Sequence, residues 1–232
     1  GTCDQGAASL MAVAQNLPYS PKDYVSIANL ALLPWVMVVR KDSGWNSIDD
    51  FIKAAKAKPG EIVFPIAGVM SADHYPWLLF AKQAGIKGNW VNFGGGGPKL
   101  KALLGKESYV DFMLAPVISS YVGEKGPLKA LAVTTPKRHP DWPKIPTFKE
   151  LGYDSVENIV IWIGIFGPKG IPKDRVEHLR NGFAKAVKDK SYLALLKNMR
   201  QKSGYMPGQD LQKYWEAEYK SAKKMIAGIG GK

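Results

Sequence analysis

The sequence predicts an α/β protein, and three observations support this prediction. Segments typical of strands and of helices alternate along most of the chain, and the loops between them are short. This alternation is typical of a largely parallel sheet flanked by helices. Of the 232 residues, 46% are apolar and 22% are charged, which are ordinary values for a globular protein. No apolar run in the sequence approaches the ~20 residues of a membrane-spanning helix.

The alternation is clearest in the first part of the chain. The apolar run 34–39 predicts a strand, and Ser47 with Asp50 resembles a capping box at the start of a helix. Pro59 and Gly60 end that helix. The further elements predicted, in order, are a strand at 61–66, a helix ending at Gly85, a strand at 89–93, a short helix ending near Leu104, and strands at 109–114 and 128–133.

The remaining part of the chain begins with a proline-rich loop at 135–146. Thr147 and Glu150 form a second capping-box pattern, which predicts a short helix. The continuous apolar run 159–166 is typical of a buried strand. Three helices are predicted after it, one opening at Pro172, one at 191–201 and one with apolar positions from Leu211 to Ile226.

The formal net charge of +12 raises the question of a nucleic-acid partner. Residues 1–155 carry 17 basic and 13 acidic side chains (net +4), and residues 156–232 carry 15 and 7 (net +8). In the last third the excess is spread along predicted helices as single lysines such as Lys185, Lys188 and Lys197. Nucleic-acid binders concentrate charge or interleave it with aromatic residues. We interpret these lysines as solvated faces and expect no nucleic acid, although a nucleic-acid binder stays an alternative.

Cysteine and histidine usage excludes several kinds of site. The single cysteine, Cys3, excludes an internal disulfide and a CxxC metal site. The histidines lack HExxH spacing, and the sequence contains no Gly-Lys-Ser/Thr phosphate loop. We therefore expect neither a metal nor a cofactor.

Two loops are candidates for ligand binding, because ligands of open α/β sheets bind where loops leave the carboxyl ends of strands. The first loop runs from Ala67 to His74 and contains Gly68, Met70 and Ser71. Small residues let a ligand approach the backbone, and free amides at the start of the next helix favour a carboxylate or phosphate. Ser71 is either a further hydroxyl donor or only a helix cap.

The second loop, Phe93 to Pro98, contains the four glycines Gly94, Gly95, Gly96 and Gly97. Four glycines cost conformational entropy, so a tight turn or a close ligand is expected there. The run is not GxGxxG and no acidic residue lies at the required place downstream, which argues against a dinucleotide site.

Catalysis needs a nucleophile and a base brought together. Ser71 and His74, three residues apart, are the one pair that we single out, which leaves a serine-dependent hydrolase as the alternative function. No third group or oxyanion site is identifiable, so we assign no catalytic residue. Among the tryptophans, Trp162 is the best candidate for a ligand contact, since it lies in a predicted strand that could cross between two lobes of the protein.

Six segments together resemble the substrate-binding proteins of tripartite tricarboxylate transporters, the TctC-like or Bug receptor family. They occur in the order and spacing of that family across nearly the whole chain, and the ordered set is specific although each segment is modest alone. The segments are NLPYSPKDY, PWVMVVRKDSGWNSIDDFIKAAKAKPGEI, AGVMSADH, VNFGGGGPKLKALLG, LKALAVTTPKRHPDWPKIPTFKELGY and WIGIFGPKGIP.

The resemblance implies a two-lobed, type II periplasmic-binding-protein-like fold, in which each lobe is a mainly parallel sheet flanked by helices. By analogy, residues 40–155 form the second lobe, and residues 1–39 and 156–232 belong to the first. Family members normally begin with further βα units before the Gly-Thr that matches Gly1-Thr2 here, so the first lobe is expected to lack its N-terminal part.

The resemblance also implies a set of ligand-binding residues. Met70 stands where the family usually has glycine and Gly94 where it usually has lysine, which predicts a less polar pocket than one for citrate. The residues expected to contact the ligand are Thr2, Ala67, Gly68, Met70, Ser71, His74, Phe93, Gly94, Gly95, Gly96 and Trp162.

The function implied is that of a periplasmic, non-enzymatic receptor. It is expected to capture a small carboxylate between its lobes, as a monomer, and to deliver it to membrane transporter subunits.

Overall fold

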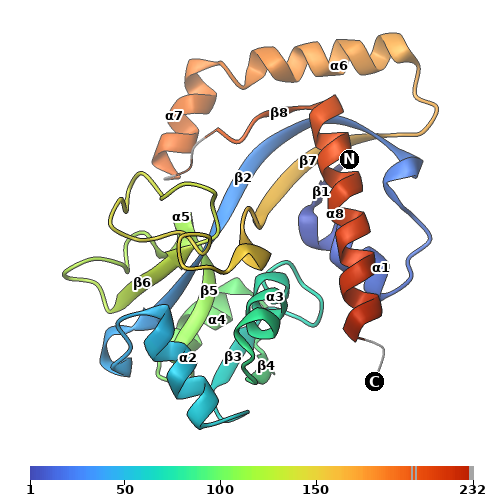
Figure 1. Ribbon diagram of the computed structural model, residues 1–232. Coiled ribbons are helices and arrows are strands. Elements are labelled where there is room, and N and C mark those ends of the chain that lie inside the picture. The colour runs from blue at the N-terminus through green and yellow to red at the C-terminus, as the bar shows by residue number, and fades with distance from the viewer. Residues whose placement is uncertain (200, 202, 230–232) are drawn as a thin grey trace. The chain divides into compact units, whose positions relative to one another are not determined.

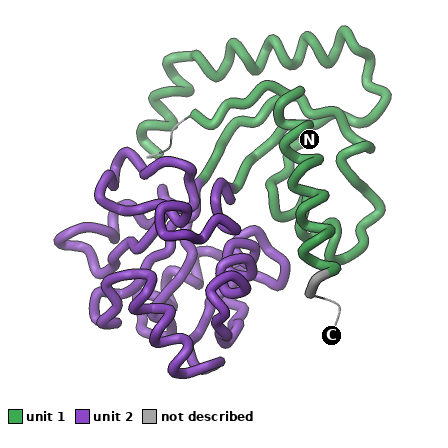
Figure 2. The backbone as a smooth tube through the Cα atoms, in the orientation of Figure 1, with its two compact units in different colours: residues 1–33, 161–232 green, residues 34–160 purple. Residues whose placement is uncertain are grey.

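The computed structural model describes residues 1–199, 201 and 203–229 and has an α/β fold (Figure 1). The chain divides into two compact units, unit 1 with residues 1–33 and 161–232, and unit 2 with residues 34–160 (Figure 2). That the two units act as lobes with boundaries at 39/40 and 155/156 stays a prediction. Across the described ranges, none of the helices is long and apolar enough to cross a membrane.

Unit 1 is built around the long strand β2 (Tyr24–Arg40), whose first part lies in this unit. β2 neighbours β7 (Val160–Pro168), which pairs antiparallel with β1 (Thr2–Asp4) at the edge. The short β8 (Met206–Pro207) pairs antiparallel with β2. The helices of this unit are α1 (Ala12–Ala14), α6 (Lys173–Ala186), α7 (Lys190–Asn198) and α8 (Gly208–Ile229).

The core of unit 1 joins residues from both of its chain segments. Ala8, Trp162, Phe166, Leu211 and Trp215 form one buried cluster. The apolar positions of α8 recur at helical spacing, and this pattern turns one face of the helix toward the cluster.

Unit 2 contains the second part of β2, which pairs antiparallel with β5 (Val110–Leu114) and β6 (Leu128–Val133). A separate two-stranded sheet pairs β3 (Val63–Ile66) in parallel with β4 (Asn89–Asn92). The helices are α2 (Ile48–Ala57), α3 (His74–Ala84), α4 (Gly96–Leu104) and α5 (Ala115–Ile118).

Aromatic rings fill the space between α2, α3 and the strands of unit 2. The rings of Phe64 and Trp77 stack with centroids 4.3 Å apart, and Phe112 meets Trp77 edge-on at 4.9 Å. These side chains are fully buried, so they fix β3, α3 and β5 against one another beneath the loops that leave β3 and β4.

The predicted α/β alternation is confirmed, and several local signals act as expected. Ser47 accepts a hydrogen bond from the Asp50 amide at the start of α2, and Gly85 adopts the left-handed conformation that ends α3. Thr147 and Glu150 exchange the two hydrogen bonds of a capping box, but a turn follows and no helix. Gly152 at φ +82° ends this turn too soon for a helix to form.

Two expectations about strands and one about a helix need correction. The strand predicted at 34–39 is part of the much longer β2, and the ladders of β2 with β5, β6 and β8 are antiparallel. Crossover helices join parallel strands, as α3 joins β3 to β4, whereas β2 enters unit 2 from unit 1 without a crossover and is antiparallel to β5 and β6. The predicted helix 191–201 ends at Asn198, and its positions beyond 199 fall partly outside the described residues.

Candidate functional site

Two loops of unit 2 leave the same edge of the β3–β4 sheet. In the parallel register Ile66 lies opposite Asn92, and the Phe93 amide donates to the Ile66 carbonyl over 2.9 Å. The segments predicted from sequence as candidate ligand loops, 67–74 and 93–98, are therefore neighbours, although His74 already belongs to α3 and residues 96–98 to α4. Ala67 directly follows the end of β3, and Phe93 directly follows the end of β4.

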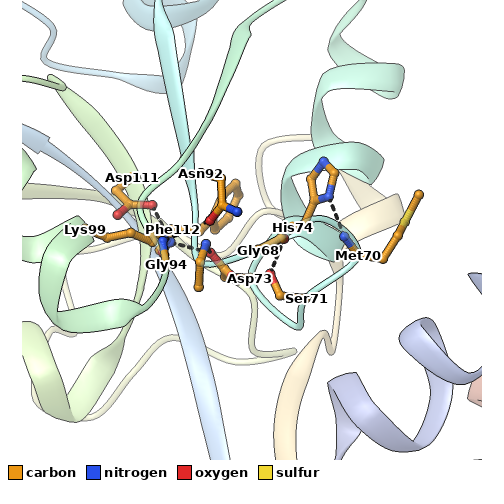
Figure 3. Close-up of polar contacts among 11 residues, drawn as sticks. Gly68, Met70, Ser71, Asp73, His74, Asn92, Gly94, Lys99, Asp111 and Phe112 are labelled. Carbon is orange, nitrogen blue, oxygen red and sulfur yellow. Dashed lines mark hydrogen bonds and ion pairs between the residues drawn. The ribbon is translucent and has the colours of Figure 1, made fainter. Parts of the chain in front are cut away.

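The β3–α3 loop is held by side chains from its own end (Figure 3). The Asp73 carboxylate accepts from the Ala67 amide over 2.7 Å and from the Ser71 hydroxyl. Met70 has φ +60°, a conformation that costs a non-glycine residue energy, and its amide donates to Nδ1 of His74 over 3.1 Å. These contacts compensate for the strain at Met70 and give the loop a defined shape.

His74 and Ser71 do not form a catalytic pair in this loop. Burial lowers the pKa of His74, and its Nδ1 accepts the Met70 amide, so the neutral ring carries its proton on Nε2. Oγ of Ser71 lies 2.6 Å from the Gly68 carbonyl oxygen and contacts Asp73. His74 thus shapes the loop through its contact with Met70, and the Ser71 hydroxyl is engaged by Gly68 and Asp73.

The β4–α4 loop presents backbone donors. Gly94 has φ +76°, which favours glycine, and its amide donates to Oδ1 of Asn92 over 2.9 Å. The Lys99 amide donates to the Gly95 carbonyl, and Pro98 has no amide hydrogen. The amides of Gly96 and Gly97 belong to the first turn of α4, where no intrahelical acceptor exists.

A buried charged cluster lies beneath both loops and was not predicted from the sequence. Nζ of Lys99 lies 2.6 Å from Oδ2 of Asp73, 2.9 Å from Oδ1 of Asp111 and 3.2 Å from the Phe112 carbonyl oxygen (Figure 3). The three charged side chains are 5% exposed or less.

Burial and charge act in opposite directions on these groups. Burial raises the pKa of Asp111 to about 7, against the attraction of Lys99. Burial also opposes ionisation of Asp73, but the charge and hydrogen bond of Lys99, with the donors Ser71 and Ala67, lower its pKa. Asp111 and Asp73 outweigh the burial of Lys99 and raise its pKa, so the ammonium stays charged.

The remaining predicted site residues, Thr2 and Trp162, belong to unit 1. Thr2 lies on the edge strand β1 and lines a cavity of about 370 Å³ together with Cys3, Phe166 and Trp215. Trp162 is fully buried in the unit 1 core, and its indole donates to Oε2 of Glu218 over 2.9 Å. A ring without an exposed face offers no platform for a ligand, and we leave Trp162 out of the candidate site.

Within the part of the chain that the structure describes, no group of three or more His, Cys, Asp or Glu side chains is placed to hold a metal ion.

Comparison with known proteins finds one matching family. The model of the "Tripartite tricarboxylate transporter family receptor" matches residues 3–230. A curated relative, the "UPF0065 protein in tcbD-tcbE intergenic region" of Pseudomonas sp. (strain P51), is 31% identical over 214 residues. The match covers 90% of this chain but 62% of that protein, so the chain spans less than two thirds of its length.

Solved structures agree in fold. A TctC solute binding protein from Polaromonas, without ligand, is 26% identical with a TM-score of 0.83, over 98% of this chain and 77% of that one. Rpa4515 of R. palustris, solved with adipate, is also 26% identical with a TM-score of 0.80, over 97% of this chain and 77% of that one. These likenesses confirm the predicted fold class.

Proposed function

The chain belongs to the tripartite tricarboxylate transporter receptor family, and on that premise we propose that it binds a small carboxylate at the β3–α3 and β4–α4 loops of unit 2. This is a receptor family and not an enzyme family, in agreement with the function predicted from the sequence. In the proposal the receptor works in the periplasm and delivers its ligand to membrane subunits of the transporter.

The observation that carries the proposal is the glycine run at the start of α4. An alanine Cβ at Gly96 or Gly97 would meet no atom within 4 Å, and neither residue has a positive φ. The fold itself therefore does not require glycine at these two positions. Close approach of a ligand to the backbone is a physical reason for their lack of side chains.

The charge of the site suits an anion. The free amides of Gly96 and Gly97 lie at the positive end of the α4 dipole, which favours a carboxylate. The ammonium of Lys99 lies near this end, but two carboxylates surround it. Backbone donors therefore supply most of the attraction.

The ligand class follows from this limited positive charge. Gly94 offers no side-chain cation, so a mono- or dicarboxylate suits the loops better than a tricarboxylate such as citrate. The adipate bound to the 26% identical Rpa4515 is a dicarboxylate, which supports the same choice. Thr2 of unit 1 is proposed as a further ligand contact, as the family resemblance implies.

A thermal-shift and calorimetry series tests the proposal. Adipate, benzoate and citrate are compared with the uncharged adipamide, and we expect adipate to raise Tm with the logarithm of its concentration. Adipamide is expected to have no effect. Failure of every carboxylate to stabilise the protein would contradict carboxylate binding.

Gly96→Ala locates the site. The added methyl group would occupy the space of the ligand, so we expect the affinity for adipate to fall about tenfold or more. Folding stability is expected to stay equal or rise by about 0.5–1 kcal/mol, as alanine favours a helix. Gly182→Ala in α6, where a Cβ also has free space, is the matched control with unchanged affinity. Equal affinity in both variants would move the ligand away from α4.

Ser71→Ala tests the predicted hydroxyl donor. Because Ser71 contacts Gly68 and Asp73, it must turn to reach a ligand. If it does, its loss is expected to weaken binding by about 1–3 kcal/mol. Unchanged affinity by calorimetry would limit Ser71 to a role within the loop.

A further inference from the structure

The buried cluster of Asp73, Lys99 and Asp111 is the feature of unit 2 that the proposed function does not use. Lys99 and Asp111 are 1% exposed or less as side chains, and one ammonium contacts two carboxylates and the Phe112 carbonyl. Burying three charged groups is costly, and apolar residues of similar volume often stabilise a fold as well. Stability alone is therefore a weak reason for this cluster.

Each ligand loop reaches the cluster through its own residue. Lys99 lies in the first turn of α4, directly after the glycine run and Pro98. Asp73 lies directly before α3 and holds both the Ala67 amide and the Ser71 hydroxyl of the first loop. The contact of 2.6 Å between Nζ of Lys99 and Oδ2 of Asp73 thus joins the two loops.

We infer that Lys99 is a positioning residue, whose ammonium fixes the β3–α3 loop against the start of α4 so that both loops present their donors as one preformed site. This inference rests on the proposed function, because it names what keeps that site in shape. Preformed donors lose less conformational entropy when a ligand binds.

The charge of the cluster depends on Asp111. Lys99 from α4, Asp73 from the β3–α3 loop and the indole of Trp77 from α3 face this carboxyl group. With Asp111 protonated, the ammonium balances Asp73. When Asp111 ionises, the cluster carries one excess negative charge, and Asp111 competes with Asp73 for the ammonium. The tie between the loops therefore weakens as the pH rises through about 7, where Asp111 titrates.

Hydrogen exchange of the full chain tests this inference without any ligand. Peptides over 67–74 and 93–98 report on the loops, and a peptide over 128–133 reports on β6. In Lys99→Met we expect exchange in both loops to rise about tenfold or more, and by a larger factor than in β6, which reports the general loss of stability. Lys101→Met, an exposed lysine on the same helix, is the matched control with wild-type exchange.

A uniform rise in the loops and β6 would overturn the inference, because it would indicate only a general loss of stability. Wild-type exchange in both loops would overturn it as well. If Lys99→Met fails to fold, Asp73→Asn keeps the shape of the side chain and removes its charge, and both loops are again expected to exchange faster.

The pH profile provides a readout that a merely structural role would not change. After correction for intrinsic rates, loop exchange in the wild type is expected to rise between about pH 6 and 8, and in Asp111→Asn to stay flat. An equal rise in Asp111→Asn would overturn the role of Asp111. Since no ligand is used, these results stand apart from a failure of carboxylates to bind.

Discussion

Unit 1 and unit 2 each place a carboxylate beside their core, but they compensate for it differently. In unit 1, Glu218 accepts hydrogen bonds from Gln5, Ser9 and Trp162, all neutral donors. In unit 2, Asp73 and Asp111 share the ammonium of Lys99. Neutral donors stabilise a carboxylate through hydrogen bonds without adding a charge. A shared cation couples two carboxyl groups, so that the ionisation of each one depends on the charge of the other.

The pKa values reflect this difference. Burial raises the pKa of Glu218 to about 7 although three donors oppose the shift. In unit 2 burial raises the pKa of Asp111 to about 7 against the attraction of Lys99, whereas at Asp73 burial is outweighed by Lys99, Ser71 and Ala67, which lower its pKa. The ammonium therefore favours the ionised form of both acids, and complete burial of Asp111 together with the donors Ser71 and Ala67 at Asp73 decides which of the two has the lower pKa.

The largest effect is expected from removal of the cation. Lys99→Met leaves two buried carboxyl groups without a cation and should reduce the free energy of unfolding by about 3–5 kcal/mol. Urea unfolding measures this loss, with Lys101→Met as a control expected within about 0.5 kcal/mol of the wild type. A loss as small as that of the control would mean that the carboxylates are protonated or solvated without Lys99.

A smaller loss is expected from the strongest neutral donor in unit 1. Trp162→Phe removes the indole donor to Glu218 and should cost about 2 kcal/mol. Repeating the substitution in a Glu218→Gln background should cost less, because the acceptor is then uncharged. Equal costs in both backgrounds would assign the effect to packing of the ring and not to the hydrogen bond.

The raised pKa of Glu218 predicts that this residue contributes to the pH dependence of the free energy of unfolding. Its pKa rises from an ordinary value of 4.5 to about 7, so between these values the folded chain binds more protons than the unfolded chain. This contribution is complete below about pH 4.5 and is lost as the pH rises to about 7. Glu218→Gln should remove about 1–2 kcal/mol of that decline, a modest figure because the residue is partly exposed. An unaltered decline in unfolding curves would exclude Glu218 as its source.

The smallest effect is expected at Ser9, whose hydroxyl donates to Oε2 of Glu218 over 3.0 Å. Ser9→Ala should cost about 1 kcal/mol, since two other donors remain. Measured with Trp162→Phe in a double-mutant cycle, the pair should show coupling through the shared oxygen. Strict additivity would argue that the two donors act independently.

The two candidate ligand loops could be predicted from local sequence, but the buried charged cluster beneath them could not. The two loops follow from strand–helix order and from the glycines at 94–97, which are signals within a few residues. Lys99 was indistinguishable by pattern from the exposed Lys101, because a lysine at the start of a helix is usually solvated. Asp111 inside the apolar strand Val110–Leu114 was the available signal, since a charge there requires a buried partner.

In the fold, too, the features that depend on nearby residues were predictable, and those that depend on residues far along the chain were not. The caps of α2 and the limits of β6 are set by nearby residues and were predictable. The full length of β2 depends on partners far along the chain, such as β8 near its end. Residues 24–33 carry no strict alternation that would mark them as a strand before those partners are known.

The continuity of β2 has a consequence for synthesis on the ribosome. Unit 2 is one uninterrupted stretch of chain, so all of its partners have emerged once residue 160 is outside the ribosome. Unit 1 must wait, because Trp215 donates to the carbonyl of Ala8, 207 positions earlier. We therefore expect unit 2 to fold before unit 1 during synthesis, and the first part of β2 to lack its unit 1 partners until β7 and β8 have been made.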